Sequence, residues 1–163
     1  MKYIAHRGLI DGPNLELENN PEHIIETLKQ FYDCEVDVWR CKDEWWLGHD
    51  LPKYKVNEKF IGMHGLWLHC KNLDALLELS TRDIHYEYFW HQEDDFTLTS
   101  GNYIWTYPGK ELTRNSISVQ PEARDEWWEW TKNCNNIAGV CTKYVKKFIL
   151  ETSFMPVGAG EKL

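Results

Sequence analysis

The sequence lacks the features of a membrane protein and of a nucleic-acid-binding protein. No stretch approaches the roughly 18 consecutive apolar residues of a membrane span, and the chain enters its first predicted strand at Lys2 without the apolar segment of a signal peptide. Excess positive charge is also missing, since the formal net charge is −8. The local basic cluster of Lys143, Lys146 and Lys147 is interpreted as the solvated face of a helix. We therefore expect no stable membrane insertion and no nucleic acid as a partner.

Cysteine is present, but not in the pattern of a disulfide scaffold or a zinc knuckle. The chain has five cysteines, an odd number, and no two of them are spaced as CxxC. Reduced thiols are the ordinary state of cysteine in the cytosol. The sequence therefore predicts a cytoplasmic protein with free cysteines.

Length and composition favour a single folded domain. A chain of 163 residues is long enough for one hydrophobic core and short for two ordinary domains. Hydrophobic residues make up 42% of the chain, well above the content of disordered proteins. We expect one domain over residues 1–152 and a Gly- and Pro-containing tail over residues 153–163. The composition does not indicate an oligomeric state.

Hydrophobic patterning predicts many short strands and few helices. Helices are expected from Pro21, over 73–79 and over 123–132. Eight core strands are expected, at residues 3–5, 34–39, 65–71, 84–90, 96–99, 103–106, 116–119 and 138–142. A hairpin arm is expected in addition at residues 45–47. A (β/α)8 barrel normally needs about 250 residues. The predicted fold is therefore α/β: a compact, reduced (β/α)8 TIM-like barrel with several helices shortened or missing.

Polar residues cluster at three points in the first half of the chain. His6-Arg7-Gly8 ends the first strand, Glu35-x-Asp37 lies in the second, and Gly48-His49-Asp50 follows the hairpin arm. Because alternate residues of a strand point to the same face, Glu35 and Asp37 share a side. Two carboxylates on one face predict a hard-cation site. The hairpin is expected to return His49 to the neighbourhood of these carboxylates.

A further strand carries two more polar residues. Period-two alternation places Trp67, His69 and Lys71 on one face. Arg7 offers a planar fork of donors suited to phosphate, and Lys71 supplies a compact positive charge. Both are predicted to bind a substrate phosphate.

Four short motifs in the first 50 residues carry a family resemblance: Ile4-Ala5-His6-Arg7-Gly8, Glu18-Asn19, Glu35-Val36-Asp37-Val38 and Gly48-His49-Asp50. Their order and spacing resemble the glycerophosphodiester phosphodiesterase family, of the phosphatidylinositol phospholipase C-like superfamily. The resemblance implies a phosphoric diester hydrolase whose substrate is a small phosphodiester, such as a glycerophosphodiester or a lysophospholipid head group. It implies a lipid-metabolism enzyme that works through a cyclic phosphate, which is either released or opened by water.

The resemblance also implies roles for particular residues. His6 and His49 are the predicted acid and base, and histidine suits either task because its unperturbed pKa is about 6.5. Glu35 and Asp37 are the predicted ligands of a divalent metal, Mg²⁺ or Ca²⁺.

The chain departs from the family pattern at two positions. The family carries Glu-x-Lys where this chain has His69-Cys70-Lys71, so imidazole replaces a third carboxylate. His69 either completes the metal site, with a shift of preference toward Mn²⁺ or Zn²⁺, or leaves that position to water. Lys143 stands where the family's closing strand would have an acidic residue.

Other interpretations of the same residues stay open. His49 alternatively caps a turn, His69 is a core histidine, and Glu18-Asn19 shapes the loop before the first helix. An acidic residue within 93–95 alternatively supplies the missing carboxylate. The alternative enzyme is a sphingomyelinase D-like phospholipase that releases choline. The alternative of another class is a catalytically degenerate module that binds phosphate groups without turnover.

Overall fold

The computed structural model describes residues 1–82, 85–123 and 136–153. The strands are β1 (Lys2–Ala5), β2 (Asp33–Cys41), β3 (Glu44–Leu47), β4 (Tyr54–Val56), β5 (Leu66–Cys70), β6 (Glu87–Trp90), β7 (Phe96–Leu98), β8 (Ile104–Thr106), β9 (Ser116–Val119) and β10 (Gly139–Thr142). The helices are α1 (Pro21–Lys29), α2 (Glu58–Ile61), α3 (Leu73–Thr81) and α5 (Val145–Ser153), with short 3₁₀ turns η1 (His6–Gly8) and η2 (Pro121–Ala123).

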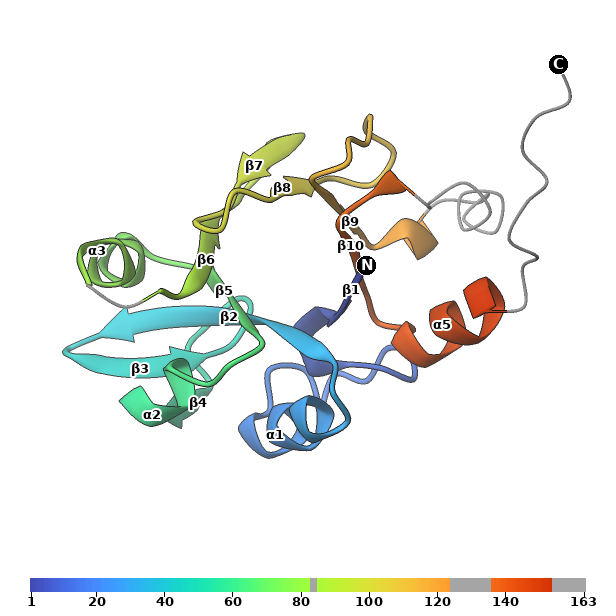
Figure 1. Ribbon diagram of the computed structural model, residues 1–163. Helices are drawn as coiled ribbons and strands as arrows, with labels where there is room; N and C mark the ends of the chain where they lie inside the picture. The colour runs from blue at the N-terminus through green and yellow to red at the C-terminus, as the bar shows by residue number, and fades with distance from the viewer. Residues whose placement is uncertain (83–84, 124–135, 154–163) are drawn as a thin grey trace, which may run out of the picture.

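The strands form one ten-stranded mixed sheet with a parallel central part. β1 lies between β10 and β2, β5 and β6 continue beyond β2, and β9 and β8 continue beyond β10, all in parallel. β3 and β4 extend from β2 as an antiparallel arm, and β7 pairs antiparallel with β8. Figure 1 shows the strands curving around an incomplete ring, with α1, α3 and α5 on its outer side.

The sheet is not closed among the residues that the structure describes. No strand ladder joins β6 to β7. Ser100, just beyond β7, instead bridges the two edges: its backbone N–H donates to the Tyr88 carbonyl oxygen at 2.9 Å, and its hydroxyl donates to the Tyr86 carbonyl oxygen at 2.7 Å. The expectation of a mixed α/β fold is confirmed, whereas a closed barrel is not observed. A single loop residue in place of a paired strand leaves the ring open at this point.

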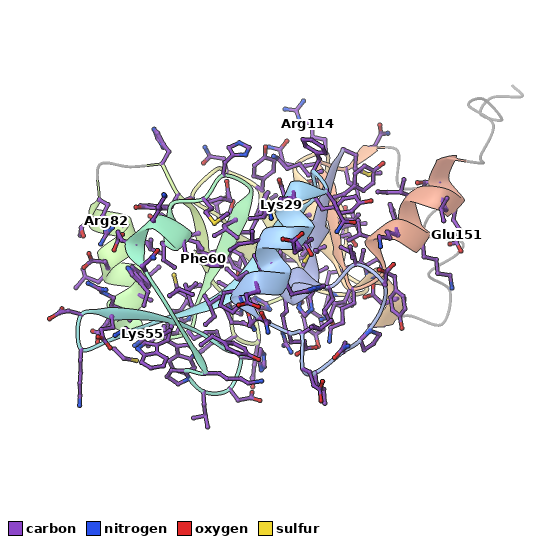
Figure 2. The ribbon with its side chains drawn as sticks, turned by 90° about the horizontal axis from the view of Figure 1, so that it is seen from below. Lys29, Lys55, Phe60, Arg82, Arg114 and Glu151 are labelled. Carbon is purple, nitrogen blue, oxygen red and sulfur yellow. The ribbon has the colours of Figure 1, made fainter. Side chains whose placement is uncertain are left out.

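The helices begin where asparagine side chains cap them. The Asn20 side chain accepts hydrogen bonds from the backbone of Glu22 and His23 at the start of α1, with Pro21 in the first turn. Asn72 caps α3 in the same way and also bonds both backbone groups of Arg40 at the end of β2. In Figure 2 side chains fill the space between α1 and the strands. These caps fix where α1 and α3 begin, and Asn72 also ties the start of α3 to β2.

Alternation along the strands divides the core into two large apolar clusters, one on the outer and one on the inner side of the sheet, and a third small cluster of Val140 and Phe148. The outer cluster packs the sheet against the helices and includes Ala5, Val36 and Leu68. The inner cluster takes one residue from each of six strands around the ring, β1, β5, β6, β8, β9 and β10: Ile4, Trp67, Phe89, Trp105, Ile117 and Cys141. The rings of Phe89 on β6 and Trp105 on β8 lie 4.4 Å apart, so they pack across the open edge. Tryptophan therefore fills much of the interior.

The structure locates most of the predicted elements. All eight core strands and the hairpin arm are present, and the helix predicted over 73–79 is α3. β4 and α2 were not expected from the pattern, because elements this short carry too little periodicity. The helix predicted over 123–132 falls almost wholly on residues 124–135, outside the described residues. Within the part of the chain that is described, none of the helices has the length and apolar character needed to cross a membrane.

Candidate functional site

Glu35, Asp37 and His69 form a compact cluster between two neighbouring strands. The parallel register of β2 and β5 pairs Asp37 with His69. His69 Nδ1 lies 3.0 Å from Asp37 Oδ1 and 3.6 Å from Glu35 Oε1. One ligand atom from each of the three residues lies within 4.8 Å of the others. The predicted alternation, with both carboxylates on one face, is confirmed.

Both carboxylates are buried and remain charged. Glu35 is 1% exposed and Asp37 is 0% exposed. Burial raises the pKa of Asp37, but hydrogen bonding by His69 and the charges of Arg7 and Lys71 outweigh it and hold the pKa well below its usual range. Burial and Asp37 likewise raise the pKa of Glu35, while His6 and His69 bring it below its usual value. Two buried negative charges need positive partners, and the site supplies them.

The hydrogen bonding of His69 tests whether the cluster fits a metal ion. Its Nε2 lies 2.9 Å from the His91 carbonyl oxygen, so Nε2 carries the hydrogen. In a neutral ring Nδ1 then directs a lone pair at two carboxylates, which requires a cation between them. Without a metal a proton takes that place: burial lowers the pKa of His69, but Asp37 and Glu35 raise it to about 9.

The donor set also fits a metal ion chemically. While the His69 ring is neutral, the buried Asp37 Oδ1 accepts no hydrogen bond from the described residues, although His69 and Lys71 lie within ion-pair distance. Adjacent ligands of an octahedral cation with bonds of about 2.1 Å are about 3 Å apart, as this oxygen and His69 Nδ1 are. Two carboxylate oxygens and one imidazole nitrogen are ordinary ligands for Mn²⁺ or Zn²⁺, and the oxygens suit Mg²⁺. The buried group of Glu35, Asp37 and His69 could therefore hold a metal ion.

Arg7 reaches the carboxylates because its backbone is left-handed, with φ of 53°. Its backbone N–H donates to Glu35 Oε2 at 2.9 Å, and its Nε lies 3.3 Å from Asp37 Oδ2. Its Nη1 donates to Glu18 Oε2 at 2.7 Å. The carboxylates thus hold the guanidinium group on the wall of the cavity. The sequence predicts that this group binds a substrate phosphate.

Asn19 fixes the position of Asp37. Its Nδ2 donates to Asp37 Oδ2 at 2.8 Å, and its Oδ1 accepts from the Asp37 backbone N–H at 2.9 Å. The side chain is buried, and the residue has φ of 56°, which asparagine tolerates better than most residues. Glu18-Asn19 therefore touches the site itself, in addition to shaping the loop.

His6 is buried beside the cluster, in the turn that follows β1. Its Nε2 lies 3.9 Å from Glu35 Oε2. Burial lowers its pKa to about 4, against the opposing attraction of Glu35, so the ring is neutral near pH 7. The amide nitrogen of Gln120 lies 3.1 Å from Nδ1 and 3.0 Å from Nε2 of this ring.

His49 lies at the rim of the same cavity. Its side chain is 40% exposed, and its Nδ1 lies 2.7 Å from Asp50 Oδ1. The Trp39 indole N–H donates to the Gly48 carbonyl oxygen at 2.6 Å and fixes the loop that carries His49. The hairpin thus brings His49 to the cavity, although it makes no ion pair with Glu35 or Asp37 among the described contacts.

Lys71 follows β5, and its Nζ lies 3.6 Å from Asp37 Oδ1. A cavity of about 650 Å³ opens over the cluster. Its walls include all seven predicted site residues, His6, Arg7, Glu35, Asp37, His49, His69 and Lys71, and also His91, Gln92, Trp105, Tyr107, Pro108, Gly109, Val119, Gln120 and Ala123. The structure therefore brings every predicted site residue into one cavity.

Sequence reasoning missed Gln120 and treated His91 only as part of an acidic turn. Gln120 is 114 positions from His6, and its left-handed backbone, with φ of 43°, is not visible in the sequence. The carboxylates suggested within 93–95 do not line the cavity, and Asp95 pairs with Lys110 at 2.8 Å. They are therefore not the missing third ligand.

One charge interpretation is wrong. Lys143 does not belong to a solvated helix face, because it precedes α5 and its Nζ donates to Glu18 Oε1 at 2.6 Å. Glu18 thus forms salt bridges with two cations, Lys143 and Arg7. Lys146, in contrast, pairs with Asp11 at the surface.

Comparison of the chain with models of protein families, with curated proteins and with solved structures gave no match.

Proposed function

We propose that this chain is a metal-dependent phosphodiesterase that hydrolyses a glycerophosphodiester or the head group of a lysophospholipid, on a (β/α)8-type barrel with reduced helices. The observation that carries the proposal is the buried cluster of Glu35, Asp37 and His69, set in one cavity with Arg7, Lys71 and two further histidines. Carboxylates for a metal, cations for a phosphate and histidines for proton transfer are the groups that phosphodiester hydrolysis needs.

The placement of these groups along the strands supports the proposal. His6 follows β1, Lys71 follows β5 and Gln120 follows β9, so all three lie at the carboxyl ends of parallel strands. Enzymes with (β/α)8 barrels place their active sites at this end. The three side chains therefore lie at the end of the strands where such enzymes carry out catalysis.

In the proposed reaction a hydroxyl next to the phosphoester attacks phosphorus. A new P–O bond forms, the P–O bond to the leaving alcohol breaks, and a cyclic phosphate results, which water opens. One of His6 and His49 accepts the proton of the attacking hydroxyl, and the other supplies a proton to the leaving oxygen. Arg7 and Lys71 orient the phosphate. When bound at Glu35, Asp37 and His69, a divalent cation supplies neutralisation of the negative charge on the phosphoryl oxygens.

The test is product formation from a panel of glycerophosphodiesters and lysophospholipids in the presence of Mg²⁺, Ca²⁺, Mn²⁺ or EDTA. We expect turnover that requires the cation and is lost in His6→Ala. The matched control is His64→Ala, because His64 is exposed and does not line the cavity. Activity that survives in EDTA, or that survives in His6→Ala, contradicts the proposal.

A second candidate is a phosphate-binding module without turnover. The observation that favours it is the compensation of Asp37 by Arg7, Lys71 and His69, which neutralises the cluster without a metal. This candidate predicts that His6→Ala leaves phosphate-ester affinity unchanged and that no cation yields product. A folded protein that binds but never turns over any substrate of the panel would favour it.

A further inference from the structure

A second hollow adjoins the catalytic cavity. This groove of about 550 Å³ is lined by Leu15, Glu18, Asn19, Gly48, His49, Asp50, Leu51, Pro52 and Lys53. His49 lines both the groove and the cavity, so the two adjoin at that side chain. Glu18 and Asn19 form the other link, since they hold Arg7 and Asp37. A ligand in the groove therefore lies next to the proposed phosphate position.

Two leucines face solvent in this groove. Leu15 is 80% exposed and Leu51 is 74% exposed. They come from separate loops, the one before α1 and the one between β3 and β4. Single exposed leucines are common on protein surfaces. Two of them on different loops that line one hollow beside an active site suggest an apolar ligand.

Both loops are held in place by hydrogen bonds. The Leu17 backbone N–H donates to the Asn14 carbonyl oxygen at 3.1 Å, and the Lys53 backbone N–H donates to the Leu47 carbonyl oxygen at 2.8 Å. The Tyr54 hydroxyl joins the two loops by donating to the Glu16 carbonyl oxygen at 3.3 Å. The exposure of the leucines is thus a property of ordered loops.

Glycine at position 48 tightens the second loop. Its φ is 148°, and a Cβ there would lie 2.1 Å from the Leu51 carbonyl oxygen. Only glycine allows the chain to fold back this closely. The close approach fixes Leu51 relative to His49.

We propose that the groove binds the acyl chain of a lysophospholipid substrate, with the acylglycerol side of the phosphodiester next to His49. This inference rests on the proposed function and names the substrate class of that site. A single acyl chain fits the observations because the leucines line a hollow that adjoins, at His49, the cavity of the proposed phosphate position. Leu15 and Leu51 then give the enzyme its preference for a lipid over a glycerophosphodiester without a chain.

A bilayer is the other apolar partner to consider, and the charges oppose it. Glu16 and Asp50 are exposed beside the two leucines, Lys53 is the one cation among the described residues that line the groove, and the whole chain carries a formal net charge of −8. Cytoplasmic membrane surfaces are negative and attract basic segments. The groove is therefore better suited to bind the acyl chain of a single lysophospholipid molecule than to insert its two loops into a membrane.

The experiment compares kcat/KM for a soluble glycerophosphodiester with that for lysophospholipids of the same head group and increasing chain length, below their micelle concentrations. The proteins are the full chain, the double variant Leu15→Ser/Leu51→Ser and the control Leu98→Ser. Leu98 is 67% exposed in β7 and does not line the groove. Binding of each protein to phosphatidylcholine vesicles is measured by co-sedimentation.

We expect kcat/KM of the full chain to rise with acyl length, and the double variant to lose about tenfold on the longer lysophospholipids. On the soluble diester the double variant should stay within about twofold of the full chain, which also reports that it is folded. The control should match the full chain on both.

Three results would overturn the inference. Turnover of the soluble diester with no gain from acyl length refutes the acyl-chain site and leaves the proposed function standing. Vesicle binding that the double variant loses assigns the leucines to a bilayer instead. No turnover of any substrate refutes the proposed function, and the acyl-chain site with it.

Discussion

His69 Nδ1 lies 3.0 Å from Asp37 Oδ1 and is aimed there by the bond from His69 Nε2 to the His91 carbonyl oxygen. The backbone carbonyl fixes the hydrogen on Nε2, so the other nitrogen is available to a cation shared with the carboxylates. The ring nitrogens of an ordinary core histidine face neutral partners, whereas Nδ1 of His69 faces two carboxylates, an arrangement that could hold a metal ion.

The first prediction concerns metal affinity at His69. His69→Ala should weaken Mn²⁺ binding by at least about tenfold, because one of three ligands is lost. His69→Glu should shift preference from Mn²⁺ toward Ca²⁺ and Mg²⁺, since a carboxylate replaces a nitrogen donor. Isothermal titration calorimetry with each metal measures both effects, and His64→Ala is the control. Unchanged Mn²⁺ affinity in His69→Ala would remove His69 from the ligand set.

The second prediction concerns Asn19. Asn19→Ala removes two hydrogen bonds to Asp37 and places alanine at a φ of 56°, so it should lower the free energy of unfolding by about 2–4 kcal/mol. Urea unfolding monitored by tryptophan fluorescence measures this. Asn115→Ala, at an exposed position, should change it by no more than about 0.5 kcal/mol. If the two variants are equally stable, Asn19 does not hold Asp37.

The third prediction is a pH dependence at Glu18. Burial raises the pKa of Glu18, but hydrogen bonds from Lys143 and Arg7 outweigh it and bring the pKa below its ordinary value. A carboxylate with a lowered folded-state pKa stabilises the protein above its unfolded-state pKa and loses that contribution as the pH falls through the folded value.

Glu18→Gln should therefore be less stable than the full chain at pH 7, by about 1 kcal/mol, because the charged hydrogen bonds weaken. The difference should shrink as the pH falls below about 4.5 and the carboxyl becomes protonated. Urea unfolding at a series of pH values measures the difference. A constant difference at all pH values would show that the charge of Glu18 contributes nothing.

The fourth prediction assigns Gln120 a positioning role for His6. Gln120→Ala should lower kcat by about tenfold and change KM by less than about twofold, since the ring loses the amide that orients it. Gln120→Asn keeps an amide donor on a shorter side chain and should recover part of kcat. The control is Gln30→Ala, at an exposed position at the end of α1. A kcat unchanged in Gln120→Ala would leave His6 oriented by other contacts.

The part of the site that lies within single strands was predictable. Alternation in β2 places Glu35 and Asp37 on one face whatever the rest of the fold does. His6 and Arg7 follow β1 at a recognisable turn. What the sequence does not contain is the curvature of the sheet, which brings Gln120 from β9 to His6 and sets Lys143 against Glu18. Such contacts depend on how the strands twist around the ring, and no local pattern records that.

The open edge of the sheet was likewise not predictable. Residues 84–90 and 96–99 both have the composition of core strands, and both do form strands, as β6 and β7. Whether two such strands pair depends on hydrogen-bond register and on the turn between them. Here β7 turns to pair with β8, and Ser100 bridges the gap by bonding the backbone of Tyr86 and Tyr88. The strand propensity of both segments is the same whether β7 pairs with β6 or with β8.

The most direct test of the account is phosphorus-31 NMR of the reaction with glycerophosphodiester, in Mn²⁺ or Mg²⁺ and in EDTA, for the full chain, Glu35→Gln and Glu26→Gln. Glu26 is exposed on α1 and serves as the control. The account predicts phosphate-ester product, with or without a cyclic intermediate, only for the full chain and the control, and only with the metal. Product in EDTA, or equal rates in Glu35→Gln, would contradict it.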